Sequence, residues 1–222
     1  MTKIFSLEGK VAVVTGSSAG LGQGMAIGLA EAGADIIGIG SRRNQEDTKR
    51  AIENIGRKFY QIQADLSRQD QISRIVEESI SKTGRVDILV NNAGVIRRNK
   101  AEEFTDEDWD VVVDVNLNAV FRLTRGIGAH MIENGSGKII NIASMLSFQG
   151  GLKVPAYAAT KHAIAGLTKS FANEWAGKGL NVNAIAPGYM VTDNTAAIRE
   201  DKERYNYITS SPNFSQGIIE SG

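Results

Sequence analysis

The stretch VAVVTGSSAGLGQGMAIGLAEAGA, residues 11–34, decides the fold class. Its β-branched start predicts a buried strand, the glycines after it a tight turn, and the alanine-rich remainder a helix. Gly16, Gly20 and Gly22 allow the backbone to approach a pyrophosphate closely, and the pyrophosphate would then rest on the amino end of that helix. A glycine-rich turn by itself is weak evidence, because a plain strand-to-helix connection can have the same pattern. Its place in the first βαβ unit favours a dinucleotide-binding turn.

The rest of the chain repeats this alternation. Five more apolar, β-branched segments follow: DIIGIG from Asp35, KFYQIQAD from Lys58, VDILVNNAG from Val86, GKIINIAS from Gly137 and LNVNAIAPG from Leu180. Helical periodicity is found over residues 22–32, 45–56, 69–83, 106–133 and 157–177. Because parallel strands need crossover connections, the sequence predicts one α/β domain over residues 1–222, Rossmann-like and doubly wound, with ligands at the carboxyl edge of its parallel sheet.

Composition and charge argue against several classes of partner. The 222 residues contain 25 Lys and Arg against 25 Asp and Glu, so no net charge attracts nucleic acid or an anionic membrane. The lack of cysteine excludes disulfides and thiolate metal sites, and we expect no metal. There is neither a signal-peptide pattern nor an apolar run of about 20 residues, so we expect a cytoplasmic protein without membrane partners.

Polar residues follow several of the predicted strands. An acidic residue after the second strand would hold the ribose of NAD, but Ser41 and Arg42 stand there. One interpretation is that Ser41 and Arg42 bind the 2′-phosphate of NADP. The other is that the two adjacent arginines that start at Arg42 are ordinary solvated charge. Asp65 is either an acceptor for the adenine amino group or a helix cap. The asparagines of NNAG, residues 91–94, either cap backbone groups or line the cofactor.

The segment SMLSFQGGLKVPAYAATK, residues 144–161, carries a serine, a tyrosine and a lysine. Tyr157 and Lys161 are four residues apart and therefore share one side of a helix. A nucleophilic Ser144 would need a neighbouring base, and neither His162, on the wrong face, nor His130, on the preceding helix, is placed to be one. A serine hydrolase is thus disfavoured.

Tyrosine as a proton donor and acceptor is the better hypothesis. Lowering a phenol pKa from about 10 to about 7 requires roughly 4 kcal/mol. A lysine cation about 5 Å away supplies roughly 3 kcal/mol at an effective dielectric near 20, while desolvation opposes the shift. Such a phenol exchanges a proton with an alcohol or carbonyl while a nicotinamide carries the hydride, and Ser144 would bind the same oxygen. On its own, the Tyr and Lys spacing is more often an ordinary surface helix.

Together these segments resemble the short-chain dehydrogenase/reductase family over residues 5 to about 205. The segments are TGSSAGLG (15–22), ADL (64–66), NNAG (91–94), DVNL with Asn116, Ser144, YAATK (157–161) and PGYMVTD (187–193). The resemblance implies that Asn116, Ser144, Tyr157 and Lys161 are catalytic, with Asn116 holding a proton-relaying water unless it is a packing compromise. With Ser41 and Arg42 added, the expected cofactor contacts are Gly16, Ser18, Gly20, Leu21, Gly22, Ser41, Arg42, Asp65, Leu66, Asn92, Ala93, Gly94, Tyr157, Lys161, Pro187, Gly188 and Thr192.

A narrower resemblance concerns the substrate. NNAGVIRR, NIASMLSFQGGLKVPAYAATK and NVNAIAPGYMVTDNT are similar to the dehydrogenase group that acts on 2-deoxy-D-gluconate or 2-dehydro-3-deoxy-D-gluconate. The resemblance implies oxidation of a secondary hydroxyl of a deoxy sugar acid with NAD, and NADP stays open. Arg97 or its neighbour Arg98 would bind the carboxylate unless both are surface charge. Gln149 and Tyr189 would bind hydroxyls beside Ser144 and Tyr157.

The carboxyl end departs from this resemblance. The family continues into a helix and a last strand, whereas residues 206–222 form an atypical tail, so we expect the usual last strand to be missing. The resemblance implies a homo-oligomer, either a tetramer or, if that strand matters for assembly, a dimer. The alternatives are a 3-oxoacyl-carrier-protein reductase and a catalytically silent dinucleotide-binding module.

Overall fold

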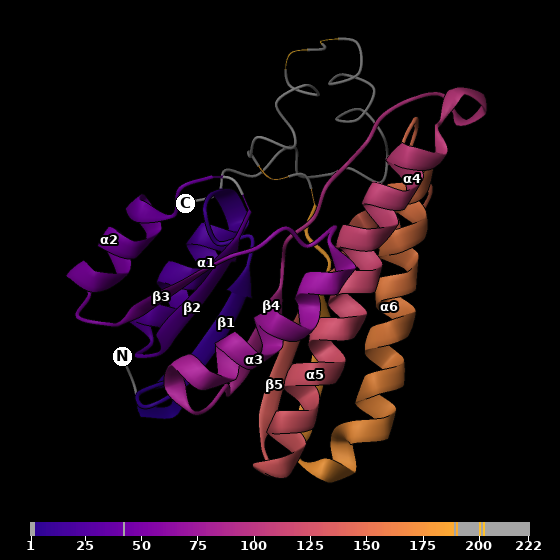
Figure 1. Cartoon of the computed structure of the whole chain (residues 1–222). Helices are drawn as coiled ribbons and strands as arrows, with labels where there is room; N and C mark the ends of the chain where they lie inside the picture. The colour runs from indigo at the N-terminus through magenta and orange to yellow at the C-terminus, as the bar shows by residue number, and fades with distance from the viewer. Residues whose placement is uncertain (1–2, 42, 189, 191–199, 201, 203–222) are drawn as a thin grey trace.

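The six strands of the described residues run parallel in one sheet, in the order β3-β2-β1-β4-β5-β6 (Figure 1). The computed structural model describes residues 3–41, 43–188, 190, 200 and 202. The strands are β1 (Val11–Thr15), β2 (Asp35–Gly40), β3 (Phe59–Gln63), β4 (Ile88–Asn91), β5 (Gly137–Ile142) and β6 (Leu180–Ile185). The strand order reverses between β1 and β4, which is the topological switch point of a doubly wound sheet. The predicted fold class is confirmed.

Helices connect successive strands and cover both faces of the sheet. The α-helices are α1 (Gly20–Glu31), α2 (Glu46–Asn54), α3 (Ile72–Thr83), α4 (Asp106–Val113), α5 (Ala119–Glu133) and α6 (Pro155–Trp175). Short 3-10 helices are η1 (Lys3–Phe5), η2 (Gln69–Gln71), η3 (Ala101–Glu103), η5 (Met145–Ser147) and η6 (Ala176–Lys178). Figure 1 shows α1 and α2 on one side of the sheet and α3, α5 and α6 on the other.

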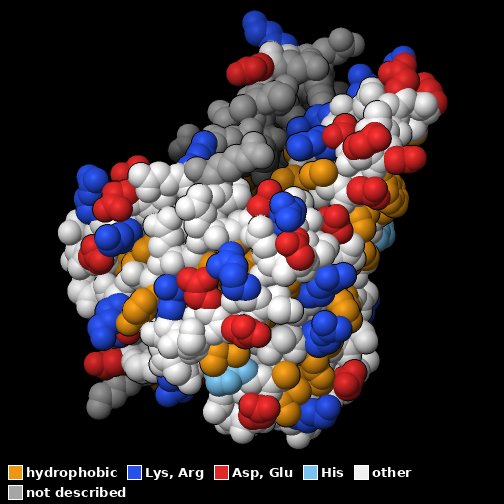
Figure 2. Space-filling view, in the orientation of Figure 1, with side chains coloured by type: hydrophobic (Ala, Val, Ile, Leu, Met, Phe, Trp, Pro, Cys, Tyr) orange, Lys and Arg blue, Asp and Glu red, His pale blue; other side chains and the backbone are white. Residues whose placement is uncertain are grey.

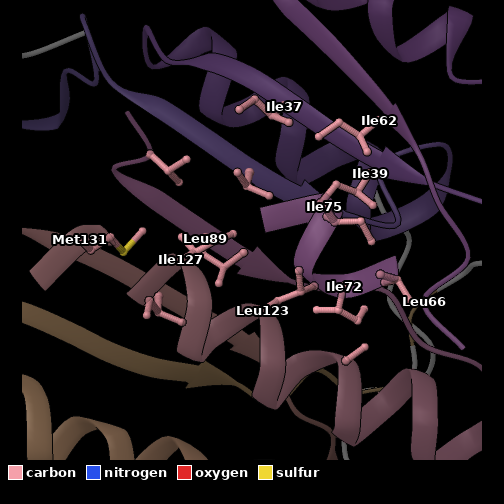
Figure 3. Close-up of a cluster of buried hydrophobic side chains, with 14 of the residues drawn as sticks. Ile37, Ile39, Ile62, Leu66, Ile72, Ile75, Leu89, Leu123, Ile127 and Met131 are labelled. Atoms are coloured by element: carbon pink, nitrogen blue, oxygen red, sulfur yellow. The ribbon is translucent and has the colours of Figure 1, made fainter. Parts of the chain in front are cut away.

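The central strands are buried on both faces, which explains their continuous apolar sequences. Every residue of β1 is buried. On one face Ala26 of α1 and Ile52 of α2 pack with Ile36 of β2. On the other face, Figure 3 shows Ile75 of α3 close to Ile39 of β2 in the same apolar cluster. Full burial of each such side chain contributes roughly 1.5–3 kcal/mol to folding, so both layers hold the sheet in place.

The helix predicted over residues 106–133 is interrupted. Between α4 and α5 the chain forms one π-helical segment, η4 (Asp114–Asn118). The segment contains Asn116, whose amide reaches the backbone of Val95 beyond β4. Single π-turns inside α-helices often mark functional sites, and an apolar periodicity does not reveal them. Sequence periodicity therefore predicted the helix but missed the feature that aims Asn116.

β6 is an edge of the described sheet and pairs with β5. Leu180 and Val182 are buried, whereas Ile185 is 51% exposed. Three predicted site residues, Arg42, Tyr189 and Thr192, lie outside the described residues, as does the tail 206–222. None of the described helices is long and apolar enough to span a bilayer. Basic and acidic side chains are interspersed on the face seen in Figure 2, in keeping with the zero formal net charge.

Candidate active site

A cavity of about 580 Å³ opens at the carboxyl ends of the strands. Its lining includes every predicted cofactor residue that the structure describes: Gly16, Ser18, Gly20, Leu21, Gly22, Ser41, Asp65, Leu66, Asn92, Ala93, Gly94, Tyr157, Lys161, Pro187 and Gly188. Ser144 lines it too. The cavity thus extends from the glycine turn to the serine, tyrosine and lysine, and their roles toward a ligand stay predictions.

The glycine turn has the shape that a pyrophosphate requires. Gly16 and Gly20 have φ values of +70° and +55°, which favour glycine. A Cβ at Gly22 would run into the Gly16 carbonyl oxygen. Ala19 begins α1 without a side-chain cap, and the first turn contains no acidic residue. The backbone N–H groups of that turn can therefore bind an anion, and the residues fit a dinucleotide.

The asparagines of NNAG divide two tasks. The Asn92 amide donates to the carbonyl of Thr15 at 2.9 Å, and its backbone N–H donates to the Thr15 hydroxyl at 2.9 Å. Asn92 thus caps the backbone of the glycine turn as well as lining the cavity. Asn91 is buried on the far side, where its amide donates to Thr124 at 2.9 Å and to Asn141 at 2.8 Å. This pair of bonds joins β4 to α5 and β5.

Asp65 also serves the local backbone. Its carboxylate accepts from the N–H of Ser67 at 3.0 Å and from the Ser67 hydroxyl at 2.8 Å. These bonds stabilise the turn before η2, whose N-cap is Arg68, so they do not make Asp65 the cap of that helix. Asp65 also lines the cavity, and its contact with adenine stays a prediction. At the end of β2, Ser41 lines the cavity together with Arg43. The residue predicted at this end was Arg42, whereas Arg43, the second arginine of the same basic pair, was not predicted.

Ser147 folds the serine segment back onto α6. Its hydroxyl donates to the carbonyl of Lys161 at 2.7 Å and accepts from the N–H of Ser144 at 3.2 Å. The Ser144 hydroxyl accepts from the N–H of Leu146 at 3.1 Å, so its own hydrogen can point to a ligand. Sequence analysis missed Ser147, and its spacing of three from Ser144, typical of a capping box, was the available signal.

Lys161 is buried at the base of the cavity. Its ammonium donates to the carbonyl of Ile142 at 2.5 Å and lies 5.5 Å from the centroid of the Tyr157 ring. The side chain is only 5% exposed, and this burial lowers the pKa of Lys161 from 10.5 to about 8. The ammonium is therefore still the main form at neutral pH, and it lies over the ring of Tyr157.

Asn116 supports the cavity from behind without lining it. Its side-chain oxygen accepts from the N–H of Val95 at 2.8 Å, and its amide donates to the Val95 carbonyl at 2.9 Å. It is 1% exposed. Both ends of the amide are thus used to fix the chain beyond β4, and the water-holding role of Asn116 stays a prediction.

Two predicted substrate residues, Arg97 and Gln149, lie outside the cavity lining, to which Ser144 and Tyr157 belong. Arg97 is exposed and pairs with Asp108 at 3.0 Å, and Gln149 is exposed. The loops that carry them are joined, because the N–H of Asn99 donates to the carbonyl of Lys153 at 3.1 Å. Among the described residues no group of three His, Cys, Asp or Glu side chains could hold a metal.

Comparisons with known proteins agree with this geometry. A 2-dehydro-3-deoxy-D-gluconate 5-dehydrogenase of Bacillus subtilis is 55% identical over 200 residues, covering 90% of this chain and 78% of that protein. The crystal structure of a putative NAD(P)-dependent gluconate 5-dehydrogenase from Beutenbergia cavernae, with bound NADP at low occupancy, is 46% identical. It superposes with a TM-score of 0.91, covering 97% of this chain and 86% of that one. A 3-oxoacyl-[acyl-carrier-protein] reductase of Thermotoga maritima is 37% identical over 195 residues, covering 87% of this chain and 79% of that protein.

The family model described as short chain dehydrogenase matches residues 10–203, which is most of the chain. The match contains the glycine turn, Asn116 and the serine, tyrosine and lysine around the cavity. The chain belongs to the short-chain dehydrogenase family.

Proposed function

We propose that this chain transfers a hydride between a nicotinamide dinucleotide and a secondary hydroxyl or ketone of a deoxy sugar acid. The observation that carries the proposal is the single cavity that runs from the glycine turn to Ser144, Tyr157 and Lys161. The substrate class is that of the Bacillus subtilis relative, a 2-dehydro-3-deoxy-D-gluconate 5-dehydrogenase. 2-Dehydro-3-deoxy-D-gluconate and 2-deoxy-D-gluconate are the substrates we propose.

The catalytic residues divide the proton chemistry among them. The Tyr157 hydroxyl gives its proton to a carbonyl oxygen during reduction and takes one from the hydroxyl during oxidation. The Lys161 ammonium stabilises the phenolate across the 5.5 Å that separates it from the ring centroid. Ser144 donates its hydroxyl hydrogen to the same substrate oxygen, since its own oxygen already accepts from Leu146. When bound, the nicotinamide supplies or removes the hydride.

The cofactor end of the cavity supports NADP as well as the NAD that the sequence resemblance implies. Ser41 and Arg43 line the cavity where β2 ends, and Asp65 is the acidic residue of the described lining. Asp65 follows β3 and turns its carboxylate to Ser67. A guanidinium and a hydroxyl at the end of β2 can bind the 2′-phosphate of NADP, whereas an acidic residue there would repel it. We therefore propose that both cofactors bind and that NADP binds more tightly.

We propose that Arg97 exchanges its ion-pair partner Asp108 for the substrate carboxylate when the substrate binds. Its guanidinium pairs with Asp108 while both side chains are more than 40% exposed, so the pair is weak. A substrate carboxylate can replace Asp108 at small cost. Gln149 and Tyr189 remain the proposed hydroxyl-binding residues.

We propose that the chain forms a homo-oligomer through the surface of α4 and α5. Trp109 and Phe121 are 41% and 38% exposed, and Phe121 stacks on Phe171 of α6 with ring centroids 6.1 Å apart. Large apolar side chains on neighbouring helices suit contact with a second copy. Light scattering after size-exclusion chromatography tests this: a monomeric mass at micromolar concentration contradicts it.

Absorbance at 340 nm tests the proposed reaction. The full chain is mixed with NAD or NADP and, in separate assays, each of the two deoxy acids or D-gluconate. An acetoacetyl thioester is tested with NADH or NADPH instead, because its ketone has to be reduced. Turnover on a deoxy acid supports the proposal, and preference for the thioester would favour the carrier-protein reductase instead. Dinucleotide binding without turnover on any substrate would favour a catalytically silent module.

A further inference from the structure

Gln45 makes unusual use of a helix start. It precedes α2, where a polar side chain commonly caps the helix, yet its side chain makes no such cap. Instead it points inward and is 1% exposed. Its amide oxygen accepts from the hydroxyl of Ser17 at 2.6 Å, and its amide nitrogen donates to the carbonyl of Gly38 at 3.4 Å. A buried glutamine thus connects the start of α2 to the glycine turn.

The sequence around Gln45 makes room for this connection. A Cβ at Gly38 would lie 2.7 Å from the Gln45 amide oxygen and 2.6 Å from the Ser17 hydroxyl. A Cβ at Gly40 would lie 3.0 Å from the Gln45 amide nitrogen. The glycines of DIIGIG at these positions therefore leave space for Gln45 and let its side chain cross the end of β2.

A second buried bond strengthens the same connection. Thr48, in the first turn of α2, donates to the carbonyl of Ser17 at 2.9 Å and accepts from the Gln23 amide of α1 at 2.9 Å. Ser17 and Thr48 are fully buried. The side chain and the backbone of Ser17 are thus both held by α2. These bonds lie behind the cavity, because neither Ser17, Gln45 nor Thr48 lines it.

The residues on either side of this connection do line the cavity. Gly16 and Ser18 flank Ser17, while Ser41 and Arg43 lie a few residues before Gln45. We propose that Gln45 is a positioning residue for the adenosine end of the dinucleotide. It holds the loop that carries Ser41 and Arg43 at a fixed distance from the pyrophosphate-binding turn, and so determines how well a 2′-phosphate is bound. The inference rests on the proposed use of a dinucleotide and not on the sugar-acid substrate.

The test is Gln45→Met in the full chain, which keeps the length of the side chain and removes both hydrogen bonds. The dissociation constants of NADPH, NADH and 2′,5′-ADP are measured by calorimetry without any sugar acid. We expect those of NADPH and 2′,5′-ADP to rise about tenfold and that of NADH about threefold, on the scale of one or two lost hydrogen bonds. At saturating NADP and a saturating deoxy acid, kcat should stay within about twofold, since Tyr157 and Lys161 lie at the other end of the cavity.

A matched control separates positioning from loss of stability. Ser79 of α3 is also fully buried, and its hydroxyl donates to the Ile75 carbonyl at 2.7 Å, but it does not line the cavity. Ser79→Ala should lower the melting temperature slightly and leave all three dissociation constants unchanged. Unchanged nucleotide binding in a folded Gln45→Met variant, or an equal change in Ser79→Ala, overturns the inference.

A second variant covers the case in which Gln45→Met does not fold. Ser17→Ala removes the same 2.6 Å bond from its other side. Ser17→Ala alone should raise the dissociation constant of 2′,5′-ADP about fivefold, and unchanged binding in folded Ser17→Ala would overturn the inference. Where Gln45→Met also folds, combining the two should add little, since their shared bond is lost only once. Full additivity of two large effects would overturn the assignment. Failure of the wild-type chain to bind any nucleotide would instead overturn the proposed function.

Discussion

The two edges of the sheet use charge in opposite ways. At the amino edge, the carboxylate of Asp87 bonds to Lys10 at 3.3 Å, to the N–H of Val11 at 3.0 Å and to Arg85. At the carboxyl edge, Lys161 is buried against a neutral carbonyl, and no carboxylate among the described residues pairs with it. At the first edge, both cations pair with the carboxylate of Asp87, and these ion pairs stabilise the fold. The cation at the second edge is left unmatched, which weakens the fold and makes the cation available to a phenolate.

The largest expected effect is on the carboxyl edge. Tyr157→Phe removes the hydroxyl that exchanges the proton and leaves the ring in place. We expect kcat to fall about 10³-fold, within the range of acid–base contributions, while the dissociation constant of the cofactor changes less than about threefold. Stopped-flow absorbance and nucleotide titration measure the two quantities. A variant that keeps substantial turnover would show that another group exchanges the proton.

Lys161→Met should separate activity from stability. We expect kcat to fall about 10²-fold and cofactor KM to rise, because the ammonium stabilises the phenolate and lines the cofactor cavity. Stability should change in the opposite direction. The pKa of Lys161 is about 8 in the folded chain and 10.5 as a free side chain, so between these values the unfolded state binds more protons and stability rises with pH.

Below pH about 8 the folded wild type therefore carries a buried ammonium that costs stability, on the order of 3 kcal/mol before the bond to Ile142 is counted. Urea unfolding at pH 7 should give Lys161→Met a free energy of unfolding at least equal to that of the wild type. The gain should shrink as pH approaches 10. A clear loss of stability at pH 7 would mean that Lys161 is a structural residue.

Asp87→Asn should give the reverse result at the amino edge. Burial works to raise the pKa of Asp87, but bonds from Arg85, the Val11 N–H and Lys10 outweigh burial and leave the pKa lowered. Its contribution to stability is therefore present above the unfolded pKa of about 3.9 and is lost as pH falls through the lower folded value. We expect a loss of about 1–2 kcal/mol at pH 7, with kcat unchanged. Urea unfolding at pH 7 and pH 3 measures this, and an equal loss at both values would contradict the electrostatic cause.

The apolar strands and the motifs of the cavity could be predicted from the sequence, whereas several buried polar side chains could not. Apolar runs such as that of β1 predict a strand covered on both faces, because they are short, rich in β-branched residues and followed by turn residues, and every residue of β1 is indeed buried. The place of the cavity was likewise predictable because the ends of parallel strands converge at one edge, while the family resemblance supplied its catalytic residues. Gln45 was not, because a buried polar side chain is recognised by its partner, and Ser17 lies 28 residues away. The bond from Ser147 to Lys161 is also distant in sequence, and only the capping-box spacing from Ser144 was a local signal for Ser147. The π-helical segment at Asn116 was not predicted for a related reason, since it changes the hydrogen bonding of the helix without changing its apolar face.

The smallest expected effect concerns the end of the cavity nearest β2. Arg43→Gln should raise the KM for NADP about fivefold and leave the KM for NAD within about twofold, because only NADP carries the 2′-phosphate that a guanidinium would bind. The control is Arg68→Gln, which removes an exposed arginine that pairs with Asp70 and does not line the cavity. Initial rates with each cofactor at a saturating deoxy acid measure the ratio. If both KM values rose together, Arg43 would act through the general charge of the cavity mouth. In that case Arg43 at the carboxyl edge would not distinguish the two cofactors, whereas Asp87 at the amino edge bonds to defined partners.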